Sequence, residues 1–181
     1  MVATVYLNPD GVLHPKPLTY EGARLPRLHA PGHRLFENAE VLECILAALP
    51  PCQVVLHTWW IFFLGYRKTI QALPSPLRNR VVGATLPGNR QAPRRQHFLI
   101  QPRRDWLRSD LRRRKPAHPV LLDCDWRQVL PELSSCSLIV EEFAGIAPAH
   151  VQVALYELLR CACFETEAET VLPVSGPTLS V

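Results

Sequence analysis

Three apolar runs in this sequence each end in polar residues that could do chemistry. Residues 3–7 lead into Asn8 and Asp10, residues 54–56 lead into His57 and Thr58, and residues 120–122 lead into Asp123. Such a run is typical of a buried strand that carries polar groups to its carboxyl end in an α/β sheet. Mg²⁺ prefers carboxylates together with water and phosphate oxygens, so Asp10 and Asp123 predict a magnesium site. Acids at strand ends also form turns and helix caps, and that alternative stays open.

The elements that position these residues predict an α/β fold with a mostly parallel central sheet. We expect strands at 3–7, 53–57, 80–85, 119–123 and 137–141, and helices at 39–49, 66–73, 103–115 and 148–163. Proline at 74 and 76 should end the second of these helices. Strands that alternate with helices imply right-handed parallel crossovers, which bring the carboxyl ends of the strands to one edge.

The spacing of apolar residues predicts which side of each helix faces the core. The helix at 39–49, with Asn38 as its N-cap, has an inward face made of Val41, Leu42, Ile45, Leu46 and Leu49. The last helix should turn the following residues inward: Val151, Val153, Leu155, Leu158 and Leu159. Trp59, Trp60, Phe62 and Phe63 are expected in the core rather than as a stacking platform for bases.

Between these elements, residues 14–35 and 86–102 lack periodicity and predict two long loops, which are uncommon unless they serve a site. We expect one domain over residues 1–163. Residues 164–181 are rich in Glu, Thr, Pro and Ser and predict a disordered tail. No apolar stretch is long enough to cross a bilayer and no signal peptide is visible, so we expect a cytoplasmic protein without a membrane partner.

Charge and cysteine content narrow the classes of ligand. The net charge of +4 is mild, but half of the twenty Lys and Arg residues lie between positions 90 and 115. This segment predicts either a solvated helix face or a nucleic-acid surface. The six cysteines show no CxxC pair, so we expect neither a zinc site nor disulfides, and most should be buried apolar residues.

Two stretches resemble motifs of the haloacid dehalogenase-like (HAD) superfamily. Residues 7–13, Leu-Asn-Pro-Asp-Gly-Val-Leu, resemble its DxDGVL motif, and residues 54–60 resemble its second motif, a strand that ends in Ser or Thr. The sequence is most similar to a small bacterial group related to the HAD domain of Swiss Army Knife RNA repair proteins. That group's VLSTSW, RVIGAT and LDDD stretches resemble residues 55–60, 80–85 and 122–125. The resemblance implies a three-layer, Rossmann-like HAD fold with helices on both faces of the sheet and no large cap domain.

The resemblance also implies a role for each matching position. It places the nucleophile at Asn8, the general acid and base at Asp10, and the phosphate-binding hydroxyl at Thr58. The basic residue of the third motif falls at Arg103, with Arg104 and Arg95 as alternatives. The Mg²⁺ ligands fall at the following positions: Asn8, Asp10 and Asp123.

Substitutions at these positions weaken the chemistry that the family performs. An amide at Asn8 lacks the anionic oxygen that attacks phosphorus and that attracts Mg²⁺. Cys124 replaces the second acid of the fourth motif, and Ile61 replaces an arginine that follows the second motif. We therefore expect weak or no phosphatase activity and weak Mg²⁺ binding. Asn8 as a simple turn residue and His57 as a packing residue are the alternatives.

Three functions remain open from the sequence. The chain could be a HAD scaffold without catalysis that binds a small phosphorylated ligand. It could be an active Mg²⁺-dependent phosphatase that acts on a small phosphate ester. It could also be a regulatory or RNA-associated domain with a nucleic-acid partner, which the arginine-rich segment suggests.

Overall fold

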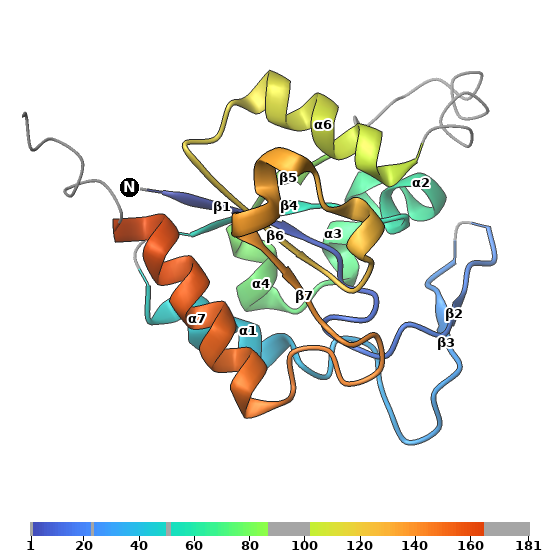
Figure 1. Cartoon of the computed structure of the whole chain (residues 1–181). Helices are drawn as coiled ribbons and strands as arrows, with labels where there is room; N and C mark the ends of the chain where they lie inside the picture. The colour runs from blue at the N-terminus through green and yellow to red at the C-terminus, as the bar shows by residue number, and fades with distance from the viewer. Residues whose placement is uncertain (1, 23, 50–51, 87–101, 165–181) are drawn as a thin grey trace, which may run out of the picture.

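Five parallel strands form the centre of the computed structural model, which describes residues 2–22, 24–49, 52–86 and 102–164 (Figure 1). Their order in the sheet is β5-β4-β1-β6-β7. The bounds of these strands are β1 Ala3–Leu7, β4 Gln53–Leu56, β5 Val81–Ala84, β6 His118–Asp123 and β7 Ser137–Ile139. Because β1 pairs in parallel with both β4 and β6, the ends of the first, second and fourth predicted strands lie side by side.

Alternation along the strands divides the sheet's side chains between two faces. Val5 and Leu7 belong to one buried cluster, and Tyr6 between them belongs to the other. Leu122 and Leu121 of β6 divide in the same way. Successive strand residues point to opposite faces, so a strand that is apolar throughout needs cover on both sides. The sequence therefore requires helices above and below this sheet.

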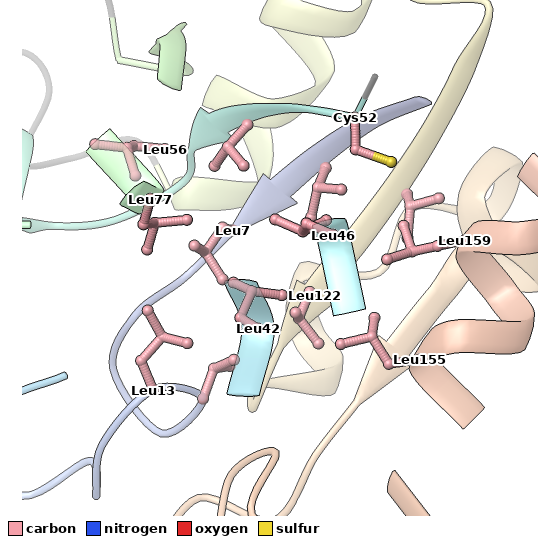
Figure 2. Close-up of a cluster of buried hydrophobic side chains, with 14 of the residues drawn as sticks. Leu7, Leu13, Leu42, Leu46, Cys52, Leu56, Leu77, Leu122, Leu155 and Leu159 are labelled. Atoms are coloured by element: carbon pink, nitrogen blue, oxygen red, sulfur yellow. The ribbon is translucent and has the colours of Figure 1, made fainter. Parts of the chain in front are cut away.

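Helices cover both faces and make three layers (Figure 1). On one face lie α1 Ala39–Ala47, α4 Ser75–Arg80 and α7 Ala149–Phe164, whose leucines pack against Leu7 and Leu122 (Figure 2). On the other face lie α6 Arg103–Arg114 and the 3₁₀ helices η2 Trp126–Gln128 and η3 Pro131–Cys136. The short helices α2 Trp60–Leu64 and α3 Tyr66–Ala72 follow β4. This architecture confirms the predicted three-layer α/β fold.

Several local predictions were wrong for identifiable reasons. The helices α2 and α4 were not predicted, and Pro76 lies in the first turn of α4, where its missing N–H costs nothing, instead of ending the preceding helix. Val153 is 63% exposed, because a residue two positions from Leu155 lies on the opposite side of a helix. The predicted N-cap of α1 is confirmed, since Asn38 occupies that position, although its side chain makes no capping hydrogen bond.

The loop predicted at 14–35 contains a small hairpin. The strands β2 Leu18–Thr19 and β3 Arg27–Leu28 pair antiparallel, and His14 at the start of the segment is fully buried. The hydroxyl of Thr19 in β2 lies 2.6 Å from Nε2 of His29, the residue that follows β3. Part of this segment therefore forms paired strands. The sequence did not predict them, because each strand has only two residues.

All six cysteines are free, as expected, but most are not buried. Only Cys52 and Cys163 are buried, with their sulfur atoms 3.8 Å apart, and Cys44 is exposed. Most of the loop predicted at 86–102, and the tail apart from Phe164, lie outside the described residues. Within the described ranges, no helix has the length and apolar character needed to cross a membrane.

Candidate functional site

A pocket of about 430 Å³ lies at the carboxyl ends of β1 and β6. The pocket-lining Asn8 and Asp10 come just after β1, and Cys124 and Asp125 directly follow β6. The pocket is lined by the following residues: Asn8, Asp10, Lys16, Leu18, Tyr20, Trp59, Pro102, Arg103, Cys124, Asp125 and Gln128. The parallel sheet thus brings polar groups that lie far apart in the sequence to one edge.

Asn8, Arg103 and Asp123 form a buried polar cluster at the base of this site. The amide nitrogen of Asn8 donates to Oδ1 of Asp123 over 3.1 Å and to the backbone carbonyl of Asp10 over 2.9 Å. The guanidinium of Arg103 lies 3.1 Å from Oδ2 of Asp123 and donates to the carbonyl of His57 over 2.6 Å. Burial raises the pKa of Asp123, and the charge of Arg103 opposes that rise. The carboxylate of Asp123 is therefore held by the protein's own donors.

The carboxylate of Asp10 is directed toward aromatic side chains. Its Oδ1 accepts a hydrogen bond from Nε1 of Trp60 over 2.6 Å and lies 3.4 Å from Nε2 of His14. Its Oδ2 accepts a hydrogen bond from the hydroxyl of Tyr20, whose ring stacks on Phe63 with centroids 4.5 Å apart. Burial raises the pKa of Tyr20, and the charge of Asp10 raises it further, so the phenol stays a donor. Both oxygens of Asp10 are thus engaged.

Glycine allows the turn after β1 to approach its neighbours closely. Gly11 has φ of 75°, and a Cβ there would lie 2.5 Å from the sulfur of Cys124. That thiol donates to the carbonyl of Asp10 over 3.2 Å, and burial followed by the charge of Asp123 raises its pKa to about 12. Gly145 has φ of 57°, and a Cβ there would lie 2.2 Å from the carbonyl oxygen of Val12. These contacts fix the turn that carries Asn8 and Asp10.

A family model described as the HAD domain in Swiss Army Knife RNA repair proteins matches residues 4–151. The chain belongs to this HAD family. The match spans every strand of the central sheet apart from the first residue of β1, and it confirms the resemblance found in the motifs around Asn8 and Asp123. Searches of curated proteins and of solved structures found no significant match.

Four of the residues that the HAD motifs single out meet at the pocket or its base. Asn8, Asp10 and Arg103 line the pocket, and Asp123 lies directly behind Asn8. Thr58 is fully buried and is not among the lining residues; its hydroxyl accepts from the backbone N–H of Trp60 over 3.3 Å. Its role as a phosphate-binding hydroxyl stays a prediction. Arg95 lies outside the described residues, and Arg104, also absent from the lining, follows Arg103 on α6.

His57 replaces the small hydroxyl of the HAD second motif and lies wholly inside the protein. Its Nδ1 lies 3.1 Å from the hydroxyl of Thr85 on the neighbouring chain segment. Burial, with the nearby charge of Arg103, holds the pKa of His57 well below its usual value. The imidazole is therefore neutral, which agrees with a packing and hydrogen-bonding role.

Three polar residues of the pocket lining were missed by sequence reasoning: Lys16, Tyr20 and Gln128. Lys16 and Tyr20 lie in a segment without periodicity, so no pattern indicated which of its side chains turn inward. Lys16 is exposed and pairs with Glu142 over 2.6 Å, while Gln128 donates to Asp125 over 2.9 Å. Among the described residues, no three His, Cys, Asp or Glu side chains are grouped to hold a metal ion.

Proposed function

We propose that this HAD chain has weak or no phosphatase activity and that its pocket binds a small phosphorylated ligand. The observation that carries the proposal is the hydrogen bond from the Asn8 amide to the carboxylate of Asp123. An amide cannot attack phosphorus as a carboxylate does, because it has no anionic oxygen. At the position where the family's chemistry needs a nucleophile, this chain has a hydrogen-bond donor.

The same contacts oppose the binding of Mg²⁺, so we expect its affinity to be weak. The NH₂ group of Asn8 lies between the carbonyl of Asp10 and the carboxylate of Asp123, where it donates to both oxygens. The guanidinium of Arg103 already balances the charge of Asp123. A cation that used these oxygens would have to displace a donor and meet a buried positive charge. The residues present therefore do not fit Mg²⁺ in this arrangement.

The pocket has the size for a small phosphorylated ligand, and one of its two cations is available to the phosphate group. Its volume of about 430 Å³ falls in the range of small-molecule sites. Of its two cations, Arg103 is held by Asp123, whereas Lys16 forms an exposed pair with Glu142. An exposed pair contributes only about 0–1 kcal/mol, so an anionic group can take the place of Glu142. Lys16 is thus available to a phosphate at the pocket mouth.

Hydrolysis of p-nitrophenyl phosphate with and without Mg²⁺ tests the catalytic part of the proposal. We expect no Mg²⁺-dependent turnover by the unmodified chain and measurable turnover after Asn8→Asp, which is lost again when Asp10→Ala is added. Robust turnover by the unmodified chain that Asp10→Ala abolishes would instead identify an active phosphatase.

Binding of inorganic phosphate, followed by isothermal titration calorimetry at low salt, tests the ligand part. We expect Lys16→Gln to weaken binding and Glu142→Gln to strengthen it, because the second change releases Lys16 from its partner. Equal affinity in both variants and the unmodified chain would place the anion elsewhere.

A further inference from the structure

Two buried cysteines meet at the edge of the sheet opposite the pocket. Cys52 directly precedes β4, whose first residue, Gln53, pairs with Thr4 near the start of β1. Cys163 lies in the last turn of α7, one residue before that helix ends. The two sulfur atoms are 3.8 Å apart, although the residues are separated by 111 positions in the sequence. The pair therefore lies at the amino ends of the strands, whereas the pocket lies at their carboxyl ends.

Packing on both elements turns the two thiols toward each other. Cys163 continues the buried face of α7 that Leu155 and Leu159 form, since the three residues follow at intervals of four. Cys52 belongs to the same buried cluster, and Figure 2 shows its sulfur directed toward α7. Cys52 is 4% exposed and Cys163 is 3% exposed. The strand and the helix thus present their sulfur atoms to each other inside the protein.

The folded state protects this pair of thiols from reaction. Burial, together with the neighbouring Cys163, raises the pKa of Cys52 to about 12, so its thiol stays protonated at neutral pH. Only a thiolate attacks a disulfide, so an oxidant reacts slowly with the pair while α7 is fully formed.

The two cysteines differ in how easily they can leave this position. The last turn of a helix opens at a lower free energy than its middle, because its carbonyls have no partners within the helix. Cys163 lies in such a turn, whereas Cys52 adjoins β4, which pairs with a strand on each side. Opening of the last turn of α7 therefore exposes Cys163 first and leaves Cys52 in place.

We propose that Cys52 and Cys163 are a redox-sensitive site that a small disulfide, such as oxidised glutathione, converts into an intramolecular disulfide. The Cys163 thiolate attacks one sulfur of oxidised glutathione, which forms a mixed disulfide and releases one glutathione thiolate. Cys52 then gives up its proton and attacks the sulfur of Cys163, which releases the second glutathione. The two protein thiols are oxidised to one disulfide, oxidised glutathione is reduced to two glutathione molecules, and the two thiol protons pass to these products.

The new bond would fasten the last described helix to the sheet. In the reduced chain, α7 is held by packing against α1, β1, β6 and β7. A disulfide between residues 111 positions apart also restricts the unfolded chain over a long loop, and such loops give the larger stabilisation. We therefore expect the oxidised protein to be the more stable form. The site lies away from the pocket, so the proposal stands whether or not the pocket binds a phosphorylated ligand.

Mass spectrometry of the folded chain after incubation with oxidised glutathione tests the bond itself. After remaining thiols are blocked and the chain is digested with trypsin, we expect a peptide pair joined through Cys52 and Cys163 that dithiothreitol separates. Cys44 and Cys161 lie on the same two tryptic peptides, so the double variant Cys44→Ala and Cys161→Ala is the matched control and should keep the joined pair.

Single substitutions test the order of the two steps. Cys52→Ala should stop the reaction at the mixed disulfide, so that one glutathionyl group accumulates on Cys163. Cys163→Ala should leave Cys52 unmodified, because Cys52 alone stays buried. Accumulation of glutathione on Cys52 in the second variant would overturn the assignment of Cys163 as the attacking thiol.

Thermal unfolding followed by circular dichroism tests the effect on stability. We expect the melting temperature of the oxidised chain to exceed that of the reduced chain by about 10 °C and to return when dithiothreitol is added. This comparison needs no substitution, so it holds even if the alanine variants do not fold. Cys44→Ala, at an exposed position, should show the full rise, and Cys163→Ala should show none.

Three outcomes would overturn the proposal. The first is the absence of the joined peptide pair under conditions in which exposed Cys44 becomes glutathionylated. The second is a joined pair that forms only after the chain has been unfolded in urea. The third is an equal melting temperature for the oxidised and reduced chains when the bond is present, which would mean that the bond does not stabilise the fold.

Discussion

The guanidinium of Arg103 lies 3.1 Å from the carboxylate of Asp123, and both side chains are buried. This ion pair joins the first residue of α6 to the last residue of β6, directly behind Asn8. Two charges removed from water stabilise the fold only while each has its partner, because the loss of one leaves the other buried and uncompensated. The pair is therefore both a structural contact and a source of the site's charge balance.

Replacement of Arg103 should destabilise the protein strongly. We expect Arg103→Met to lower the free energy of unfolding by about 3–5 kcal/mol at neutral pH, because the buried charge of Asp123 then has no cation to balance it. Arg108→Met is the matched control, since its pair with Asp105 is exposed and contributes about 0–1 kcal/mol. Urea unfolding measures both. Equal losses in the two variants would contradict the importance of the buried pair.

The deficit of Arg103→Met should also depend on pH. Arg103 opposes the rise in the pKa of Asp123 that burial causes, so its removal lets that pKa rise further. A carboxyl whose folded pKa exceeds its unfolded pKa binds more protons when folded, and stability then falls as the pH rises between the two values. We therefore expect the deficit to shrink as the pH is lowered, in urea unfolding curves recorded at several pH values. A deficit that is constant with pH would show that Asp123 does not titrate in this way.

His57 should make the protein less stable in mild acid. Burial and the charge of Arg103 hold its folded pKa well below the usual value of 6.5, so the unfolded chain takes up a proton that the folded chain does not. Stability is therefore present above pH 6.5 and is lost as the pH falls toward the folded pKa, by at most about 1.4 kcal/mol per pH unit.

The variant His57→Gln removes this titration while it keeps a polar side chain near Thr85. We expect its stability to depend less on pH between neutral and mildly acidic solution than that of the unmodified chain. His150→Gln, at an exposed position, should keep the original dependence. If His57→Gln and the unmodified chain have parallel curves, the buried imidazole is not the group that titrates.

The predicted sheet was recovered from the sequence because its strands are buried on both faces. Short apolar runs such as residues 54–56 and 120–122 are typical of strands that are covered on both faces, and the polar residues that follow mark where each strand ends. The site was recovered in part for the same reason, since Asn8, Asp10 and Asp123 lie at such ends. The resemblance to HAD motifs added Arg103, which charge patterning alone could not distinguish from its neighbours on α6.

Contacts that depend on tertiary packing were not accessible to the same reasoning. Tyr20 reaches Asp10 from a two-stranded hairpin whose strands have two residues each, too short for any period to be visible. The two short helices α2 and α4 have five and six residues, less than two turns, so their apolar spacing gives no clear face. The pairing of Arg113 and Arg114 with Asp110 likewise follows from the burial of Asp110, which a segment rich in charged residues did not indicate.

Gly145 should be essential to the turn that carries the site residues. A Cβ at this position would lie 2.2 Å from the carbonyl oxygen of Val12, and the positive φ of 57° is also unfavourable for other residues. We expect Gly145→Ala to lower the free energy of unfolding by about 2 kcal/mol or more. Gly22→Ala is the control, because Gly22 has φ of 58° but no atom near its Cβ position. The difference between the two variants in urea unfolding isolates the steric contact with Val12.

Asn8→Asp should make the stability of the protein depend on Mg²⁺. The new carboxylate oxygen would lie where the Asn8 amide nitrogen now donates to Asp123 over 3.1 Å, so the hydrogen bond would become a repulsion between two anions. We expect a lower melting temperature without Mg²⁺ and recovery when Mg²⁺ is added, since a ligand that binds the folded state stabilises it. The unmodified chain should show little response. Asn38→Asp, a matched change at the start of α1, should show none, and a response of equal size in that variant would mean that Mg²⁺ acts outside the site.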